Sequence, residues 1–127
     1  MASEKVDRKA TLRFLEQREA ERQKRLDEAF DRALADFERI VELIINDFTP
    51  SEIWQWGSLL DRRRFSEISD IDIAVEGLGS PQKIFNLLRR AEELTNFELD
   101  VVELERIEPE FERLIRQKGK KVYERPR

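Results

Sequence analysis

The sequence predicts an α+β domain: a small mixed sheet flanked by helices and preceded by a long N-terminal helix. Residues 3–48 contain no glycine and no proline. Between Leu26 and Phe48, apolar residues recur at three- and four-residue steps, which is the pattern of a helix with one buried face. The segments 52–56, 71–75 and 97–104 are short, β-rich and bounded by turn residues, as strands are. We therefore expect helices and strands to alternate around one core.

Two parts of unequal character make up the chain, a helical segment at residues 1–48 and a sheet domain at residues 49–127. The second half of the helical segment is expected to pack on the domain. Residues 16–25 are nearly all polar and follow an apolar group, Val6, Leu12, Phe14 and Leu15. Two interpretations stay open: a solvated helical extension supported by charge pairs one turn apart, or an arm that pairs with a second copy or a partner protein.

The order of elements after the first helix follows from helix-breaking residues and from the spacing of apolar residues. Pro50 ends the helix and favours an extended Thr49. Strand alternation in 52–56 places Ile53 and Gln55 on one face and Trp54 and Trp56 on the other. A helix is expected over 81–94, with Ser80 as its N-cap, and another over 105–117. Residues 120–124 are expected to form an edge strand or an extended tail.

Composition excludes several classes of chemistry. The 127 residues include no cysteine and no histidine, so disulfides, thiolate or imidazole metal sites and Ser-His triads are ruled out. The net charge of −4 gives no general attraction to nucleic acid, and no direct DNA binding is predicted. No apolar run reaches the roughly 20 residues of a membrane span. We expect a cytoplasmic protein that does not bind membranes and works with carboxylates, hydroxyls and cations.

Three carboxylates are the candidate site. Asp70 and Asp72 are two residues apart in a strand, so they leave the same face about 7 Å apart along the chain. Asp100 stands in the third strand and completes the set if that strand lies beside 71–75. Clustered carboxylates repel one another, and a divalent cation such as Mg²⁺ is the usual compensation. The alternative is structural: Asp70 caps a turn and Asp100 is exposed on an edge strand.

A glycine and a serine stand where the first strand ends. Gly57 permits a positive φ and a close approach of backbone to a ligand, and Ser58 supplies a hydroxyl and an amide for phosphate oxygens. Three arginines follow, and Arg62 is the one we select as a nucleotide-binding candidate. A run of three arginines is also typical of a solvated loop.

These motifs together resemble the signature of the DNA polymerase beta-like nucleotidyltransferase superfamily. Gly57-Ser58 is followed after eleven residues by Asp70-Ile71-Asp72, and Asp100 occupies the place of the third acid. The chain looks most like the minimal nucleotidyltransferases (MNT), over residues 53–124. It departs from them after Ser58, where the segment 59–63 contains no glycine.

The resemblance implies nucleotidyl transfer assisted by two Mg²⁺ ions. Asp70 and Asp72 would bridge the ions, roughly 3.5–4 Å apart. Asp100 would help to bind one ion and favour deprotonation of the attacking hydroxyl. Gly57 and Ser58 would bind the β and γ phosphates of the donor.

Proteins of this kind are often antitoxins paired with a HEPN-domain ribonuclease toxin, which implies ATP as the donor and a toxin hydroxyl as the acceptor of AMP. Two alternatives stay open. The first is an antitoxin that acts by binding alone with little or no catalysis, and the second is a nucleotidyltransferase for small molecules. The N-terminal helix gives a further expectation, a homo-oligomer.

Overall fold

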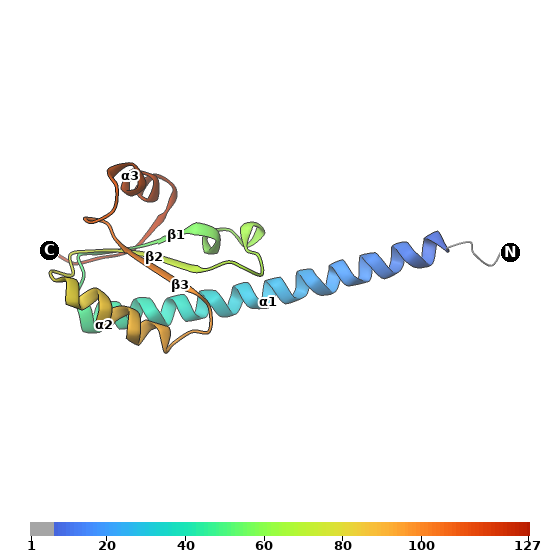
Figure 1. Cartoon of the computed structure of the whole chain (residues 1–127), viewed down its shortest axis with the longest axis horizontal. Helices are drawn as coiled ribbons and strands as arrows, with labels where there is room; N and C mark the ends of the chain where they lie inside the picture. Colours follow the sequence, from blue (N-terminus) through green and yellow to red (C-terminus); the bar gives the residue numbers. More distant parts are fainter. Residues whose placement is uncertain (1–6) are drawn as a thin grey trace.

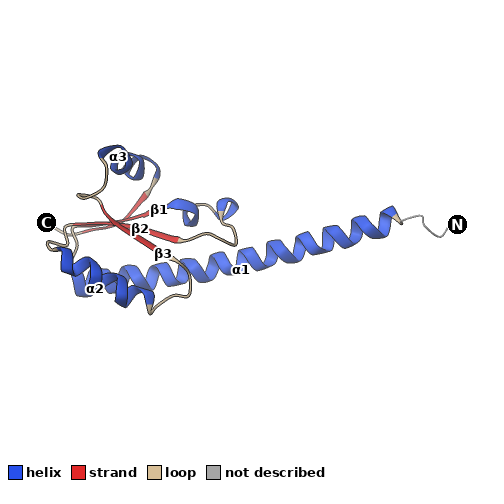
Figure 2. Ribbon diagram, in the orientation of Figure 1, coloured by secondary structure: helices blue, strands red, loops and turns tan. Residues whose placement is uncertain are grey.

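The computed structural model describes residues 7–127, with three α-helices, two short 3-10 helices and four strands (Figures 1 and 2). The α-helices are α1 (Arg8–Phe48), α2 (Pro81–Glu92) and α3 (Pro109–Lys118). The strands are β1 (Glu52–Trp56), β2 (Ile71–Glu76), β3 (Leu99–Glu103) and β4 (Lys120–Glu124). The 3-10 helices η2 (Gly57–Leu60) and η3 (Arg62–Arg64) lie between β1 and β2. The predicted α+β class is confirmed.

The four strands form one mixed sheet in the order β3-β2-β1-β4. β1 pairs antiparallel with β2 and with β4, and β2 pairs parallel with β3. Because parallel neighbours need a crossover, α2 connects β2 to β3 across one face of the sheet. Of the two expectations for residues 120–124, the edge strand is the one observed.

Helices cover the two faces of this sheet unequally. Figure 2 shows α1 and α2 on one side and α3 on the other. The larger core lies between the sheet and α1, with Ile53, Ile71 and Ile73 fully buried. The smaller core lies under α3 and includes Trp54 and Trp56. The alternation predicted for β1 is therefore confirmed.

The first helix divides at about residue 25. Its second half packs on the sheet through seven buried residues, as expected: Leu26, Phe30, Ala33, Phe37, Ile40, Ile44 and Phe48. Every residue from 8 to 25 is exposed, and this part of α1 projects away from the body (Figure 1). Asp7 caps the helix by accepting hydrogen bonds from the amides of Lys9 and Ala10. Val6, expected to belong to the apolar group, lies outside the described residues.

Among residues 7–127, none of the α-helices contains an apolar stretch of the length that a membrane crossing needs.

The end of α1 corrects one expectation. Thr49 is not extended but left-handed, with φ 44° and ψ 57°. A left-handed residue after the last helical turn reverses the chain sharply, and here it allows β1 to fold back along α1. The helix does end at the proline, but local steric preference before proline is outweighed by the packing of α1 on the sheet.

The two later helices are shorter than their periodicity suggested. α2 ends at Glu92 and α3 begins at Pro109, the position where proline is favoured. Ser80 stands at the N-cap of α2, but its side chain makes no capping hydrogen bond. Boundary shifts of this size are usual, because helix ends depend on cap geometry more than on periodicity.

One arginine attaches α3 to the sheet. The guanidinium of Arg116 donates to Glu76 at 2.8 Å, Glu112 at 3.0 Å and Glu52 at 3.2 Å, and lies over the ring of Trp54. These residues come from β2, α3 and β1. The hydrogen bond with Glu76 is the largest of several contacts that raise the pKa of Arg116 above its ordinary value.

Replacing this arginine should weaken the whole domain. We expect Arg116→Met to lower the free energy of unfolding by about 2 kcal/mol, because three carboxylates then face one another without a cation. The partial exposure of Arg116 keeps the loss below that of a fully buried pair. Arg113→Met, on an exposed position of the same helix, is the matched control. Equal losses in urea denaturation of the two variants would contradict the assignment.

Candidate active site

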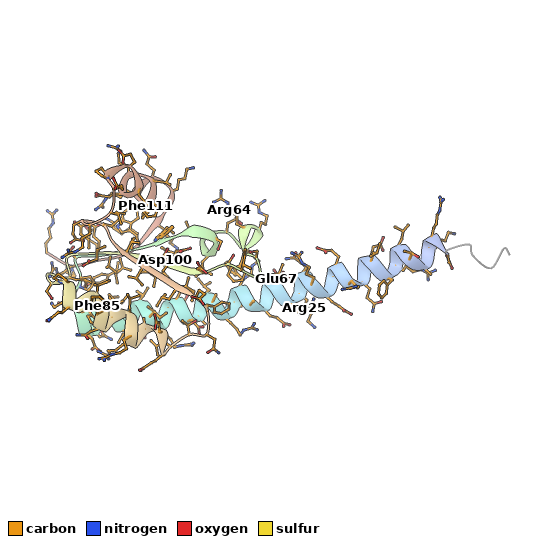
Figure 3. All side chains as sticks on the ribbon, viewed as in Figure 1. Arg25, Arg64, Glu67, Phe85, Asp100 and Phe111 are labelled. Carbon is orange, nitrogen blue, oxygen red and sulfur yellow. The ribbon has the colours of Figure 1, made fainter. Side chains whose placement is uncertain are left out.

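Parallel pairing of β2 with β3 brings two of the three predicted carboxylates together. Asp72 and Asp100 are direct partners in the register. Partners in neighbouring strands face the same side of the sheet, and Trp56, the partner of Asp72 in β1, shows that this side is the one under α3. Figure 3 shows Asp100 on the sheet, with Phe111 of α3 and Arg64 on the same side of it. The strand that contains Asp100 therefore lies beside the strand that contains Asp72, as the candidate site required.

Asp70 directly precedes β2 on the same alternation as Asp72. The turn before it is closed by Ser66 and Ser69, where the Ser66 amide donates to Ser69 Oγ at 2.8 Å. Within residues 7–127, Asp70 makes no capping hydrogen bond, contrary to the structural alternative. Asp100 is exposed on an edge strand, as that alternative expected, and this exposure leaves it open to a large ligand.

Gly57 lies against the carboxylate of Asp72. It has φ +81°, and a Cβ placed on it would come 2.1 Å from Asp72 Oδ2. No side chain fits in that space, and the backbone conformation itself favours glycine. Gly57 has the predicted positive φ and the predicted close approach of its backbone to another group. In this structure that group is the carboxylate of Asp72 and not a ligand. Ser58 follows in the single turn of η2 and is partly buried.

Burial and mutual repulsion alter the acidity of the central carboxyl group. The pKa of Asp72 is raised from 3.8 to about 6, first by burial and then by the charges of Asp100 and Asp70. Both other carboxylates are thus near enough to act on Asp72. Stored repulsion of this kind is typical of sites that bind a cation or transfer protons.

Comparison with known proteins agrees with this geometry. A family model described as polymerase beta, nucleotidyltransferase, matches residues 38–127. The chain belongs to this nucleotidyltransferase family. No curated protein matches the sequence. Among solved structures, the chain resembles the one described as the toxin-antitoxin MntA-HepT, with a TM-score of 0.56, 18% sequence identity, and coverage of 72% of this chain and 73% of that chain. At that identity, the likeness shows the fold alone.

The family match begins inside the packed half of α1. Residues 38–48, which belong to the buried half of α1, fall within the nucleotidyltransferase match. The exposed half falls outside it, together with residues 26–37. The family match therefore covers neither the projecting part of α1 nor the first packed residues that follow it.

The donors at the site suit a hard divalent cation. Asp70, Asp72 and Asp100 offer only carboxylate oxygens, which Mg²⁺ prefers. Among residues 7–127, no three acidic side chains already stand together as a metal-binding group.

Arg62 is placed differently from the prediction. Its guanidinium donates to Asp31 Oδ1 at 2.6 Å, lies 3.6 Å from Asp27 Oδ1, and stacks 4.4 Å from the centre of the Phe30 ring. All three partners belong to α1. Arg62 therefore attaches the segment after Gly57-Ser58 to α1, and a nucleotide-binding role for it stays a prediction that this geometry does not favour.

A pocket of about 190 Å³ adjoins Gly57 on the side of α3. Trp56, Phe111 and Leu114 provide apolar walls, and Arg64 and Lys118 bring positive charge. In residues 7–127, Trp56 Nε1 is the single buried side-chain nitrogen or oxygen without a hydrogen-bond partner. The position of Lys118 beside Gly57 was not predicted from the sequence. Basic residues predominate from Arg113 onward, which was a partial signal. A larger hollow of about 660 Å³ lies between α1 and the α2–β3 connection and contains none of the three acids.

The contact between Gly57 and Asp72 gives a first prediction for the site. Gly57→Ala should destabilise the fold more than Gly79→Ala does. Both glycines have positive φ, but nothing lies within 4 Å of a Cβ at Gly79, so its substitution costs only the left-handed strain of about 1–2 kcal/mol. The excess at Gly57 should shrink in an Asp72→Ala background, as measured by a double-mutant cycle in urea. If the losses of unfolding free energy from Gly57→Ala and Asp72→Ala are additive, the contact between Gly57 and Asp72 is contradicted.

The raised pKa of Asp72 gives a second prediction, on metal-free protein in chelator. The folded state holds the Asp72 proton more tightly than the unfolded state, so the free energy of unfolding should fall as pH rises from about 4 to about 6. We expect a loss of about 1–2 kcal/mol, reduced from the full value of the shift by solvent screening. Asp72→Asn should match the wild type near pH 4 and exceed it in stability at pH 7.5. Parallel stability curves for the two proteins would disprove the repulsion.

Proposed function

We propose that this chain is a Mg²⁺-dependent nucleotidyltransferase that moves AMP from ATP to a hydroxyl group of another protein. The observation that supports the proposal is the pairing of Asp72 with Asp100 across β2 and β3, with Gly57 packed against Asp72. The family gives the general activity, and these three residues supply the groups that such a reaction needs.

The roles follow from position. Asp70, Asp72 and Asp100 would hold Mg²⁺, which when bound neutralises phosphate charge and lowers the pKa of an attacking hydroxyl. Gly57 and Ser58, at the end of β1 beside Asp72, would contact the donor phosphates through the backbone and the Ser58 hydroxyl. Arg64 and Lys118 add positive charge next to this turn. Asp100, exposed on the edge strand, would receive the proton of a hydroxyl that a large acceptor presents.

The proposed acceptor is a HEPN-domain toxin. The related fold in the MntA-HepT structure is part of a toxin-antitoxin pair. By analogy, we propose that this chain is the antitoxin of such a pair and neutralises its toxin by adding AMP. An exposed third acid is compatible with an acceptor as large as a protein.

A second candidate is an antitoxin that neutralises by binding alone. It is favoured by the segment after Ser58, which lacks glycine and whose Arg62 is held by α1 rather than left for phosphate. The intact set of three acids favours catalysis. The two candidates differ in whether AMP is transferred.

Transfer of label from α-labelled ATP to a HEPN-domain protein supplied as the acceptor is the direct test. Asp70→Asn and Asp72→Asn should each reduce the rate by about 100-fold or more, the scale observed when one key electrostatic contact is removed. Glu92→Gln, an exposed carboxylate on α2, should leave the rate unchanged. Transfer that survives both aspartate substitutions would refute the proposed site, and no transfer by the wild type alongside tight binding would favour the second candidate.

A further inference from the structure

The exposed half of α1, residues 8–25, carries apolar side chains that nothing in the described chain covers. Leu12, Phe14 and Leu15 are 57%, 58% and 54% exposed. Leu12 and Leu15 are one turn apart and share a side of the helix, near the tip of the part that projects from the body. Phe14 lies toward another side, where the guanidinium of Arg18 stands over its ring. We name residues 8–25 the arm. Large apolar side chains grouped on a projecting helix are typical of a surface that another molecule covers.

The arm leaves the body at the same end of the sheet as the three acids. Arg22 on the arm donates to Glu67 at 3.2 Å, and Glu67 lies three residues before Asp70. Ile68, between them, is 90% exposed. Figure 3 shows Glu67 beside the point where α1, at Arg25, extends beyond the body. A molecule lying along the arm would therefore reach Ile68 and, next to it, the acids.

Charge separates the arm from the rest of the chain. Residues 8–25 contain seven basic and three acidic side chains, a net charge of +4 within a chain of net −4. The remaining residues therefore sum to −8. An acidic surface that also offers apolar side chains is complementary to the arm.

These features favour a protein over the other possible occupants. Glu16, Glu19 and Glu21 interrupt the basic residues and would repel the phosphates of nucleic acid. Phosphates also would not cover the exposed leucine side chains. Two arms of like charge would repel each other. A second copy of the body is acidic, but among its residues 26–48 no large apolar side chain is prominently exposed. Its exposed Phe85 lies on α2, and substitution of Phe85 in the test below distinguishes a second copy from the acceptor protein.

We propose that the arm, together with Ile68, is the docking surface for the acceptor protein, whose contact face is acidic and partly apolar. The proposal rests on the proposed function, since it assigns the arm to the protein that accepts the nucleotidyl group. Docking along the arm brings the acceptor to the end of the sheet where Asp70 precedes β2, without any contribution from the arm to nucleotide binding. The arm then determines which protein is modified.

The test measures affinity and transfer separately, with the same HEPN-domain protein as probe. Leu12→Gln with Leu15→Gln keeps good helix formers on the arm and should raise the Kd for the probe at least tenfold. The same double variant should raise KM for the probe, with kcat and the affinity for Mg²⁺-ATP within twofold of the wild type. Phe85→Gln, which removes a side chain 74% exposed on α2, is the control and should change none of these values.

A charge-reversed arm tests the complementarity. Arg13→Glu with Arg18→Glu should also weaken binding at least tenfold, more at low than at high ionic strength. Lys83→Glu with Arg89→Glu, an equal change of net charge on exposed positions of α2, should not. Circular dichroism of each variant confirms that helix content is kept.

The outcomes distinguish this inference from the proposed function. Unchanged Kd in both arm variants overturns the docking surface, even if Asp72→Asn abolishes transfer. Weakened binding by the arm variants, together with a wild type that transfers no AMP, supports the docking surface and refutes the function. Absence of any binding to the probe overturns the inference. It is also overturned if the arm substitutions change only the mass of the free chain in light scattering, which would indicate pairing with a second copy. The same holds if they change only the affinity of the chain for RNA.

Discussion

Parallel pairing of β2 with β3 is the constraint on which the rest of this structure depends. It places Asp72 opposite Asp100, and it requires α2 as a crossover on the face that α1 also covers. The other face is left to α3 alone. Because the acids lie at one end of that second face, they are near solvent on one side and near the α3 core on the other. Partial burial of this kind raises the pKa of Asp72 while keeping the site open.

Burial and the charges of Asp100 and Asp70 raise the pKa of Asp72, and the elements around the site are joined by contacts that do not use these acids. Arg116 joins α3 to both central strands through Glu52 and Glu76. Arg62 joins the connection after Gly57 to α1 through Asp27 and Asp31. Each arginine pairs with carboxylates that are distant from it in the sequence, so these contacts support the elements around the site without using its three acids.

The long first helix has two physically distinct halves. From Leu26 onward, buried apolar residues make it part of the core, and the nucleotidyltransferase match begins within this half. Before Leu26, the helix continues as a basic arm, held at its base by Arg22 and Glu67. Helix propagation from a packed half is favourable, so the fold can present a helical arm beside the site without adding a second domain.

Hydrophobic periodicity determined the buried half of α1, the faces of β1 and the order of elements, because these depend on local spacing. The motif residues Gly57, Asp70, Asp72 and Asp100 were also readable, since alternation along a strand sets which face each side chain leaves. The sequence did not determine what Arg62 contacts, the left-handed Thr49, or Lys118 beside Gly57. These depend on which strands are neighbours and on how helices cover the sheet. Strand pairing joins residues far apart in the chain, so only the tertiary structure decided that Asp100 faces Asp72 and that the arm leaves the body beside them.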